Sequence, residues 1–290
     1  MADHYDFLRY PQGKTKAVTL SYDDGSLHDV KLWEMVNKNH LKCTFNLNSK
    51  RLLAGKSMTV EQAMGLLADG HEVAVHGDGH FANGLVRPVE GIRDVLVCRD
   101  TLEKTLGCII RGMAYPDTGI TRFTNGSSYE TVRNYLQELG IVYARTLGGD
   151  NDRFELPADW YAWMPTVHSI NPKLQEYMET FVALDVDSCA YTKRYPRLFY
   201  LWGHAFEFNN NNNWELIDQI GDTLGGKEDT WYATNMEIYD YVTAYNSLIT
   251  SVDGNRIYNP TLIPVWFVRS YRTKDAVLHC VMPGQTIVIE

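Results

Sequence analysis

Carboxylates and histidines suited to hydrolytic chemistry occur at separate places in the chain. Asp23 and Asp24 stand side by side in SYDDG, and His76 and His80 begin and end HGDGH. Two imidazoles and one carboxylate make a three-donor set that leaves Zn²⁺ an open position, as in hydrolytic zinc sites. Adjacent residues at a strand end point in different directions, so one aspartate can bind the metal while the other faces a substrate as a base.

Two further residues extend this set. Arg111, in RGMAYP, could pair with a catalytic carboxylate and fix its orientation. His204, in FYLWGHAFEF, is a titratable imidazole at the end of an apolar run, and Trp202 two residues earlier offers an apolar wall. Taken singly, each feature has an ordinary explanation: Asp-Asp-Gly is common in turns, and a lone histidine or arginine is more often structural.

Predicted strands and helices place these residues together. Strands are expected at residues 17–22, 43–47, 71–76, 108–114, 141–146 and 197–202, and helices at 27–37, from 59 to about 69, at 89–106, 128–139, 214–224 and 237–248. This alternation implies a parallel sheet, most simply closed as a barrel. The chemically active residues all fall near the ends of strands, and a barrel gathers such ends on one face.

Composition limits the functions that remain. The 290 residues carry a formal net charge of -9 and no block rich in lysine or arginine, which argues against nucleic acid or an anionic membrane surface as partner. The five cysteines are scattered and never form CxxC, so neither a disulfide framework nor a thiolate zinc site is indicated. Without an apolar leader segment, the sequence as it stands predicts a cytoplasmic protein, or an extracellular one if it has been trimmed.

With these motifs in order, residues 15–250 resemble the NodB-like polysaccharide deacetylases, carbohydrate esterase family 4. That family has the motifs TFDDG, H-S/T-x-x-H, R-x-P-F/W/Y and L-x-H, which SYDDG and HGDGH match most specifically. The resemblance implies an α/β fold, a distorted parallel (β/α) barrel of about seven strands, over residues 1–250. Residues 251–290, with apolar runs separated by Pro and Gly, are expected to form a small C-terminal β appendage.

The resemblance also implies roles for the residues. Asp24, His76 and His80 would hold a divalent metal, with Zn²⁺ expected; Asp23 would be the general base, His204 the general acid, and Arg111 the tether of Asp23. The backbone amide of Tyr22 or of Tyr115 would stabilise the oxyanion, and Trp202 would line the substrate side. The implied reaction is removal of an N-acetyl group from an amino sugar or polysaccharide.

Departures from the family pattern leave other functions open. Gly77 replaces the usual Ser/Thr, RGMAYP is longer than R-x-P-F/W/Y, and Trp202 replaces Leu in L-x-H. The last change touches the wall that would receive the acetyl methyl group. Hydrolysis of another C–N bond, in a cyclic imide or small amide, is therefore an alternative. A catalytically silent carbohydrate-binding protein is a second, in which the asparagines at 209–213 could contact a sugar.

Overall fold

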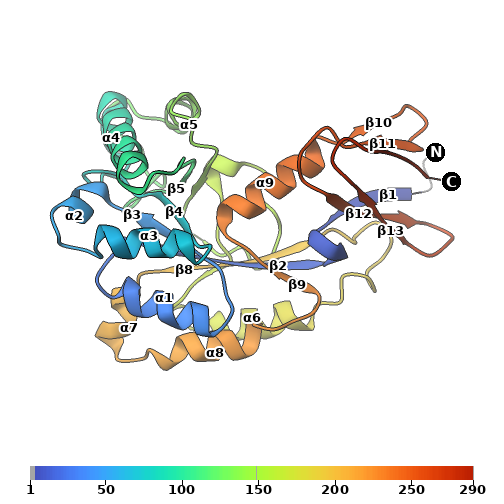
Figure 1. Ribbon diagram of the computed structural model, residues 1–290, viewed down its shortest axis with the longest axis horizontal. Coiled ribbons are helices and arrows are strands. Elements are labelled where there is room, and N and C mark those ends of the chain that lie inside the picture. The colour runs from blue at the N-terminus through green and yellow to red at the C-terminus, as the bar shows by residue number, and fades with distance from the viewer. Residues whose placement is uncertain (1–3, 148, 290) are drawn as a thin grey trace.

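A curled sheet of parallel strands forms the centre of the molecule in the computed structural model, which describes residues 4–147 and 149–289 (Figure 1). The strand order is β6-β5-β4-β3-β2-β8-β7, and β9 pairs with the amino half of β2. The strands are β2 (Lys16–Asp23), β3 (Cys43–Leu47), β4 (Glu72–Val75), β5 (Gly112–Ala114), β6 (Tyr143–Arg145), β7 (Val167–His168), β8 (Arg197–Gly203) and β9 (Thr230–Tyr232). This confirms the predicted distorted parallel barrel.

Helices follow most of the strands and cover the sheet; Figure 1 shows α4 and α5 on one side and α6, α7 and α8 on the other. They are α1 (Asp29–Lys38), α2 (Ser49–Leu53), α3 (Val60–Ala68), α4 (Pro88–Leu106), α5 (Tyr129–Glu138), α6 (Leu174–Ala183), α7 (Ala205–Asn211), α8 (Glu215–Leu224) and α9 (Asn235–Asn246), with short 3-10 turns at Pro11–Gly13 and Trp160–Ala162. Local sequence fixes several ends: Thr59 and Gln62 form a capping box at α3, and Gly107 ends α4 with a φ of 70°.

Strand β2 is the most deeply placed element. All eight of its residues are buried. It pairs with β8 along almost its whole length, and on its other side with β9 near the beginning and β3 near the end. A strand enclosed in this way has little freedom to move, so it holds its last residue, Asp23, in a fixed position at the carboxyl end of the sheet.

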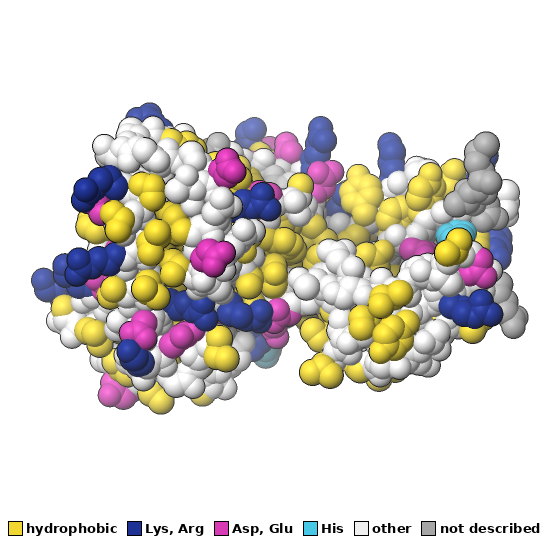
Figure 2. Space-filling view, turned by 90° about the horizontal axis from the view of Figure 1, so that it is seen from above, with side chains coloured by type: hydrophobic (Ala, Val, Ile, Leu, Met, Phe, Trp, Pro, Cys, Tyr) yellow, Lys and Arg dark blue, Asp and Glu magenta, His cyan; other side chains and the backbone are white. Residues whose placement is uncertain are grey.

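A β-rich lobe stands beside the barrel. It contains the antiparallel sheets β1-β12-β13 and β10-β11-β14, formed from β1 (His4–Arg9), β10 (Ile249–Thr250), β11 (Arg256–Tyr258), β12 (Val265–Tyr271), β13 (Val277–Val281) and β14 (Thr286–Val288). Arg269 binds both carboxylate oxygens of Asp6 at 2.8 Å, joining β12 to β1. Figure 2 shows hydrophobic side chains in the hollow between barrel and lobe. The division into 1–250 and 251–290 stays a prediction, although β1 completes a sheet of the later segment.

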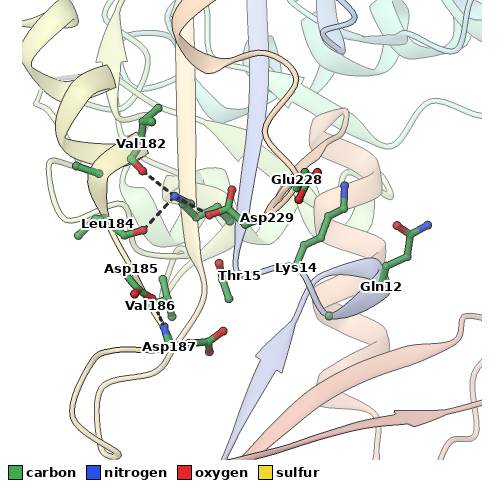
Figure 3. A pocket seen from close by; sticks show the side chains of 13 residues that line it. Gln12, Lys14, Thr15, Val182, Leu184, Asp185, Val186, Asp187, Glu228 and Asp229 are labelled. Atoms are coloured by element: carbon green, nitrogen blue, oxygen red, sulfur yellow. Dashed lines mark hydrogen bonds and ion pairs between the residues drawn. The ribbon is translucent and has the colours of Figure 1, made fainter.

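The amino end of the sheet carries a cavity of about 460 Å³ beside the start of β2 (Figure 3). Its main feature is the buried ammonium of Lys16, which lies 2.8 Å from a carboxylate oxygen of Asp229 and donates to the carbonyls of Val182 and Leu184 at 3.0 Å each. Lys16 thereby satisfies carbonyls at the C-terminal end of α6. None of the predicted site residues lines this cavity. None of the helices described is long and apolar enough to span a membrane.

Candidate active site

The predicted catalytic groups meet at the carboxyl ends of β2, β4 and β8. Asp23 is the last residue of β2, His76 follows β4, and His204 follows β8. Asp24 has a φ of 79°, a left-handed conformation that costs a non-glycine residue roughly 1–3 kcal/mol. The abrupt turn that it makes with Gly25, whose φ is 61°, separates its side chain from that of Asp23.

Asp24, His76 and His80 each present one donor atom to a common region. Oδ1 of Asp24 lies 3.3 Å from Nε2 of His80 and 3.7 Å from Nε2 of His76. The donor atoms of all three residues are within 4.8 Å of one another. Residues 76–80 form a loop rather than a helix, and the loop returns His80 to His76 so that their ring centroids are 4.8 Å apart.

The hydrogen bond made by His76 determines which of its ring nitrogens is available. Nδ1 lies 2.9 Å from the carbonyl oxygen of Ala114. A carbonyl can only accept, so Nδ1 carries the proton and Nε2, facing Asp24, has a free lone pair. Burial lowers the pKa of His76 and so favours its neutral form. This is the protonation state that a metal ligand requires.

Asp24 offers an independent test of whether a cation fits. Its Oδ1 is buried and has no hydrogen-bond partner among the described residues. Burial alone would raise the pKa of Asp24, but the close contact with His80 and the charge of His76 outweigh it and lower the pKa, so the group is ionised. The 3.3 Å contact with Nε2 of His80 leaves this buried charged oxygen incompletely compensated, and a divalent cation shared with the two imidazoles would remove that cost. The donor set suits Zn²⁺.

The loop that carries the histidines is anchored by hydrogen bonds. The side chain of Asn48 donates to the carbonyl of Gly77 at 2.7 Å, and Asp94 of α4 accepts from the amide of Gly79. Gly77 has a φ of 75°, and a Cβ there would lie 2.3 Å from Oδ2 of Asp94. The glycine that replaces the family's Ser/Thr is therefore required by the local backbone and by Asp94.

Replacing Gly77 by alanine is expected to lower the free energy of unfolding by more than the roughly 1–2 kcal/mol that a left-handed backbone alone costs. The added methyl group must displace Asp94, which holds the loop. Gly107→Ala is the matched control, because Gly107 has a φ of 70° and a Cβ added there would have no heavy atom within 4 Å. Urea denaturation of both variants measures the difference, and equal losses would show that the contact with Asp94 is unimportant.

Asp23 lies beside the three candidate metal ligands but is held differently. Its side chain is 3% exposed, its Oδ2 contacts Nη2 of Arg145, and its Oδ1 accepts from the amide of Asn46 at 2.8 Å. Burial alone would raise the pKa of Asp23, but the charges of Arg145, His76 and His204 outweigh it and lower the pKa. Asp23 is thus an oriented carboxylate, close to His76 but directed at a different partner.

Arg111, predicted to tether Asp23, does not do so, and that prediction is wrong. Its Nη2 binds both carboxylate oxygens of Asp240 in α9, at 2.7 and 3.0 Å. The reason is positional: β5 begins only at Gly112, so Arg111 lies at the amino end of the strand, away from Asp23. The tether is Arg145, the last residue of the neighbouring strand β6, which is fully buried.

His204 is oriented by a carboxylate from its own helix. It is the N-cap residue of α7, its Nδ1 lies 3.3 Å from Oε1 of Glu207, and its Nε2 lies 4.0 Å from Oδ2 of Asp23. Burial alone would lower the pKa of His204, but the bond to Glu207 and the charge of Asp23 outweigh it and raise the pKa. His204 is therefore placed to hold a proton next to Asp23.

Trp202 lies near these groups, as the sequence suggested. The guanidinium of Arg145 lies 4.3 Å from its ring centroid, and His168 meets it edge on with centroids 4.3 Å apart. Its side chain is partly exposed, so one surface remains open beside His204, whose ring centroid is 5.9 Å away. Trp202 can form an apolar wall of the site.

The two tyrosines are not placed as substrate contacts. Tyr22 is fully buried inside β2, between its partners Phe45 of β3 and Gly203 of β8, so its side chain cannot reach a substrate. The amide of Tyr115 already donates to the carbonyl of Arg145 at 3.0 Å, which extends the β5–β6 ladder. That bond removes the Tyr115 amide as an oxyanion donor, which corrects the Tyr115 prediction, whereas the role of the Tyr22 backbone amide stays a prediction.

Sequence reasoning missed Arg145, Asn46 and Glu207. Arg145 could have been found, because it is a charged residue at the end of a predicted apolar strand, the same signal that identified Asp23. Glu207 follows His204 by three residues, which is the spacing of a capping box. Asn46 lies inside a short apolar strand and gave no comparable signal.

Fold and site together define an α/β barrel protein with a histidine–carboxylate centre at the carboxyl ends of its strands. Residues 10–144 match the model of the polysaccharide deacetylase family. This part of the chain is similar to that family, in agreement with the resemblance that the motifs indicated.

Solved structures share the fold. One is a candidate polysaccharide deacetylase from Mycobacterium smegmatis, with 17% identity, a TM-score of 0.58, and coverage of 83% of this chain and 94% of that chain. Another is a mutant of the peptidoglycan deacetylase PdaC from Bacillus subtilis, with 13% identity, a TM-score of 0.50, and coverage of 80% and 94% respectively. No curated protein matches the sequence.

Proposed function

We propose that the protein is a metal-dependent hydrolase that removes the N-acetyl group from an amino sugar or polysaccharide. The observation that supports this most is the buried, unpartnered Oδ1 of Asp24, which faces Nε2 of both His76 and His80 beside the carboxylate of Asp23. Asp24, His76 and His80 would hold the divalent metal, with Zn²⁺ the expected ion. When bound, such an ion supplies Lewis acidity toward the amide carbonyl and lowers the pKa of water.

Asp23 is suited to be the general base of this reaction. Its lowered pKa keeps it ionised at neutral pH, and Arg145 and Asn46 hold its oxygens. It would accept a proton from the water whose oxygen forms the new bond to the acetyl carbon. Because the carboxylate cannot rotate away from these partners, the proton acceptor is oriented before substrate arrives.

His204 is suited to be the general acid. Its raised pKa favours the protonated ring, and Glu207 accepts from Nδ1, so that Nε2 faces Asp23 and the reacting groups. It would donate its proton to the amide nitrogen as the C–N bond breaks, leaving acetate and a free amine. Glu207 acts in this scheme as a positioning residue.

The substrate class rests on the match of residues 10–144 to the polysaccharide deacetylase family together with the open side of the site. PdaC, one of the structural neighbours, is named as a peptidoglycan deacetylase, and an N-acetylated polysaccharide of this kind is what we propose for this chain. Trp202 would provide the apolar surface beside the scissile acetyl group. Its indole is larger than the leucine of the family motif, so we expect a preference for small acyl groups.

The test is acetate release by the zinc-loaded protein from N-acetylated glucosamine oligomers and from peptidoglycan fragments, with small amides and a cyclic imide assayed in parallel. Turnover of the sugars supports the proposal. Turnover of the small amides or imide alone would replace it with hydrolysis of another C–N bond. A zinc-loaded protein that binds the oligomers without releasing acetate would be a silent carbohydrate-binding relative.

His204→Ala is expected to lower kcat for acetate release by roughly 10²- to 10⁴-fold, the usual contribution of a general acid. Zinc should remain at Asp24, His76 and His80, because His204 is not among the donors of that triad. The comparison requires kcat and the zinc content of the same preparation. Full turnover in the zinc-loaded variant would show that another group protonates the leaving amine.

A further inference from the structure

A second group of metal-binding side chains lies next to the proposed acid. It consists of His168 at the end of β7, His204 after β8, and Glu207 in the first turn of α7. Oε2 of Glu207 lies 3.4 Å from Nε2 of His168, and Oε1 lies 3.3 Å from Nδ1 of His204. One donor atom from each residue lies within 4.8 Å of the other two, as in the triad of Asp24.

The surroundings allow an ion to reach this group. The side chains of His168, His204 and Glu207 are 19%, 23% and 17% exposed, so none is sealed in the core. Two imidazoles and one carboxylate again match the preference of Zn²⁺. The positive charge of the nearby Arg145 guanidinium is offset by its pairing with the carboxylate of Asp23, so it repels an incoming cation only weakly. Nδ1 of His168 accepts from the backbone amide of Ile170 at 3.2 Å, so zinc binding at Nε2 would require the ring proton to move to Nδ1 and this bond to break.

We infer that His168, His204 and Glu207 form a second Zn²⁺ site, and that zinc bound there inhibits the enzyme. The inhibitory effect rests on the proposed function, whereas the binding itself does not. The ion would bind Nδ1 of His204, the nitrogen that faces Glu207, and would release the proton carried there to solvent.

Inhibition follows from the chemistry of the imidazole. A ring with zinc on Nδ1 cannot become the imidazolium that gives a proton from Nε2 at neutral pH, because the metal occupies the position of one of the two protons. Glu207 would at the same time be withdrawn from its role of orienting His204. The second ion would therefore remove the general acid without disturbing Asp24, His76 or His80.

The binding test is a zinc titration of the metal-free full chain, followed by calorimetry and by metal analysis after removal of excess ion. We expect two zinc ions per wild-type chain, one per chain of His168→Gln, and one per chain of His76→Gln. Glutamine at residue 168 keeps a hydrogen-bond donor for Glu207 and removes the imidazole. His40→Asn, at an exposed histidine with a φ of 54° that asparagine tolerates, is the control and should still bind two.

The activity test uses the same variants with an N-acetylated glucosamine oligomer. Acetate release by the wild type should rise with the first equivalent of zinc and fall, by about 10²-fold at saturation, with the second. His168→Gln should keep its activity at the higher zinc concentration. A wild type that binds one ion, or a His168→Gln variant that still binds two, overturns the site. Binding of two ions with undiminished turnover at excess zinc overturns the inhibition, and absence of turnover at every zinc level speaks against the proposed function alone.

Discussion

Arg145→Gln is expected to lower the free energy of unfolding by about 3–5 kcal/mol and to suppress acetate release. Arg145 is fully buried and Asp23 is 3% exposed, so removal of the guanidinium leaves a buried carboxylate whose remaining side-chain hydrogen bond among the described residues comes from Asn46, with His76 and His204 about 4 Å away. The loss should appear in urea denaturation near neutral pH. Because the charge of Arg145 helps to lower the folded-state pKa of Asp23 in the wild type, the difference between the two proteins is present at neutral pH and shrinks as the pH falls through the folded-state pKa.

Arg111→Gln is the matched control, since it breaks the other arginine–carboxylate pair. Arg111 and Asp240 are each 37% exposed, and a pair in such contact with water contributes roughly 0.2–1 kcal/mol. We expect this variant to keep both stability and turnover. If Arg111→Gln were the more damaging of the two, the assignment of Arg145 as the residue that orients Asp23 would have to be abandoned.

His76→Gln is expected to weaken binding of the first zinc ion by well over 10²-fold and to abolish turnover at limiting zinc. Substitution of a residue that merely orients a ligand already costs roughly 10- to 100-fold in metal affinity, and this change removes a ligand itself. His76 is 1% exposed and its Nε2 has Asp23 and Asp24 as its ion-pair neighbours, so no exposed group replaces it readily. Competition with a chromophoric chelator measures the affinity.

His279→Gln provides the comparison for that titration, because His279 lies on β13 in the β-rich lobe, far from the triad in sequence and in a different sheet. The affinity of the His279→Gln variant for the first zinc ion should equal that of the wild type. Unfolding transitions of both variants should be recorded, since a buried histidine can also support the fold. Unchanged zinc affinity in a folded His76→Gln protein would place the metal elsewhere.

The barrel and the position of the triad could be predicted because they depend on local patterns. Apolar runs alternate with amphipathic segments, and the two motif segments directly follow strands, so topology alone brings Asp24, His76 and His80 to one face. The partner of Asp23 could not be assigned in the same way. The strand predicted at 108–114 begins in the structure only at Gly112, four residues later than expected. This difference moves Arg111 to the opposite end of the sheet.

Short elements were the other source of error. Strands β7 and β9 have two and three residues, too few to show a period, and α6 lies in a stretch that begins with loop-forming residues. The asparagine run is not wholly a loop. Its first part ends α7, and Asn212 terminates the helix with a φ of 48°, a conformation that asparagine accepts more easily than most residues. The conformation of such segments is determined by tertiary packing rather than by local sequence.

The pairing of β1 with β12 has a consequence for the order of folding. His4 lies opposite Tyr271, so the two paired strands are separated in sequence by the whole parallel sheet. Contacts so distant in sequence form slowly, because a long loop must close first. We expect the parallel sheet to assemble while β1 is still unpaired, and the β-rich lobe to close afterwards.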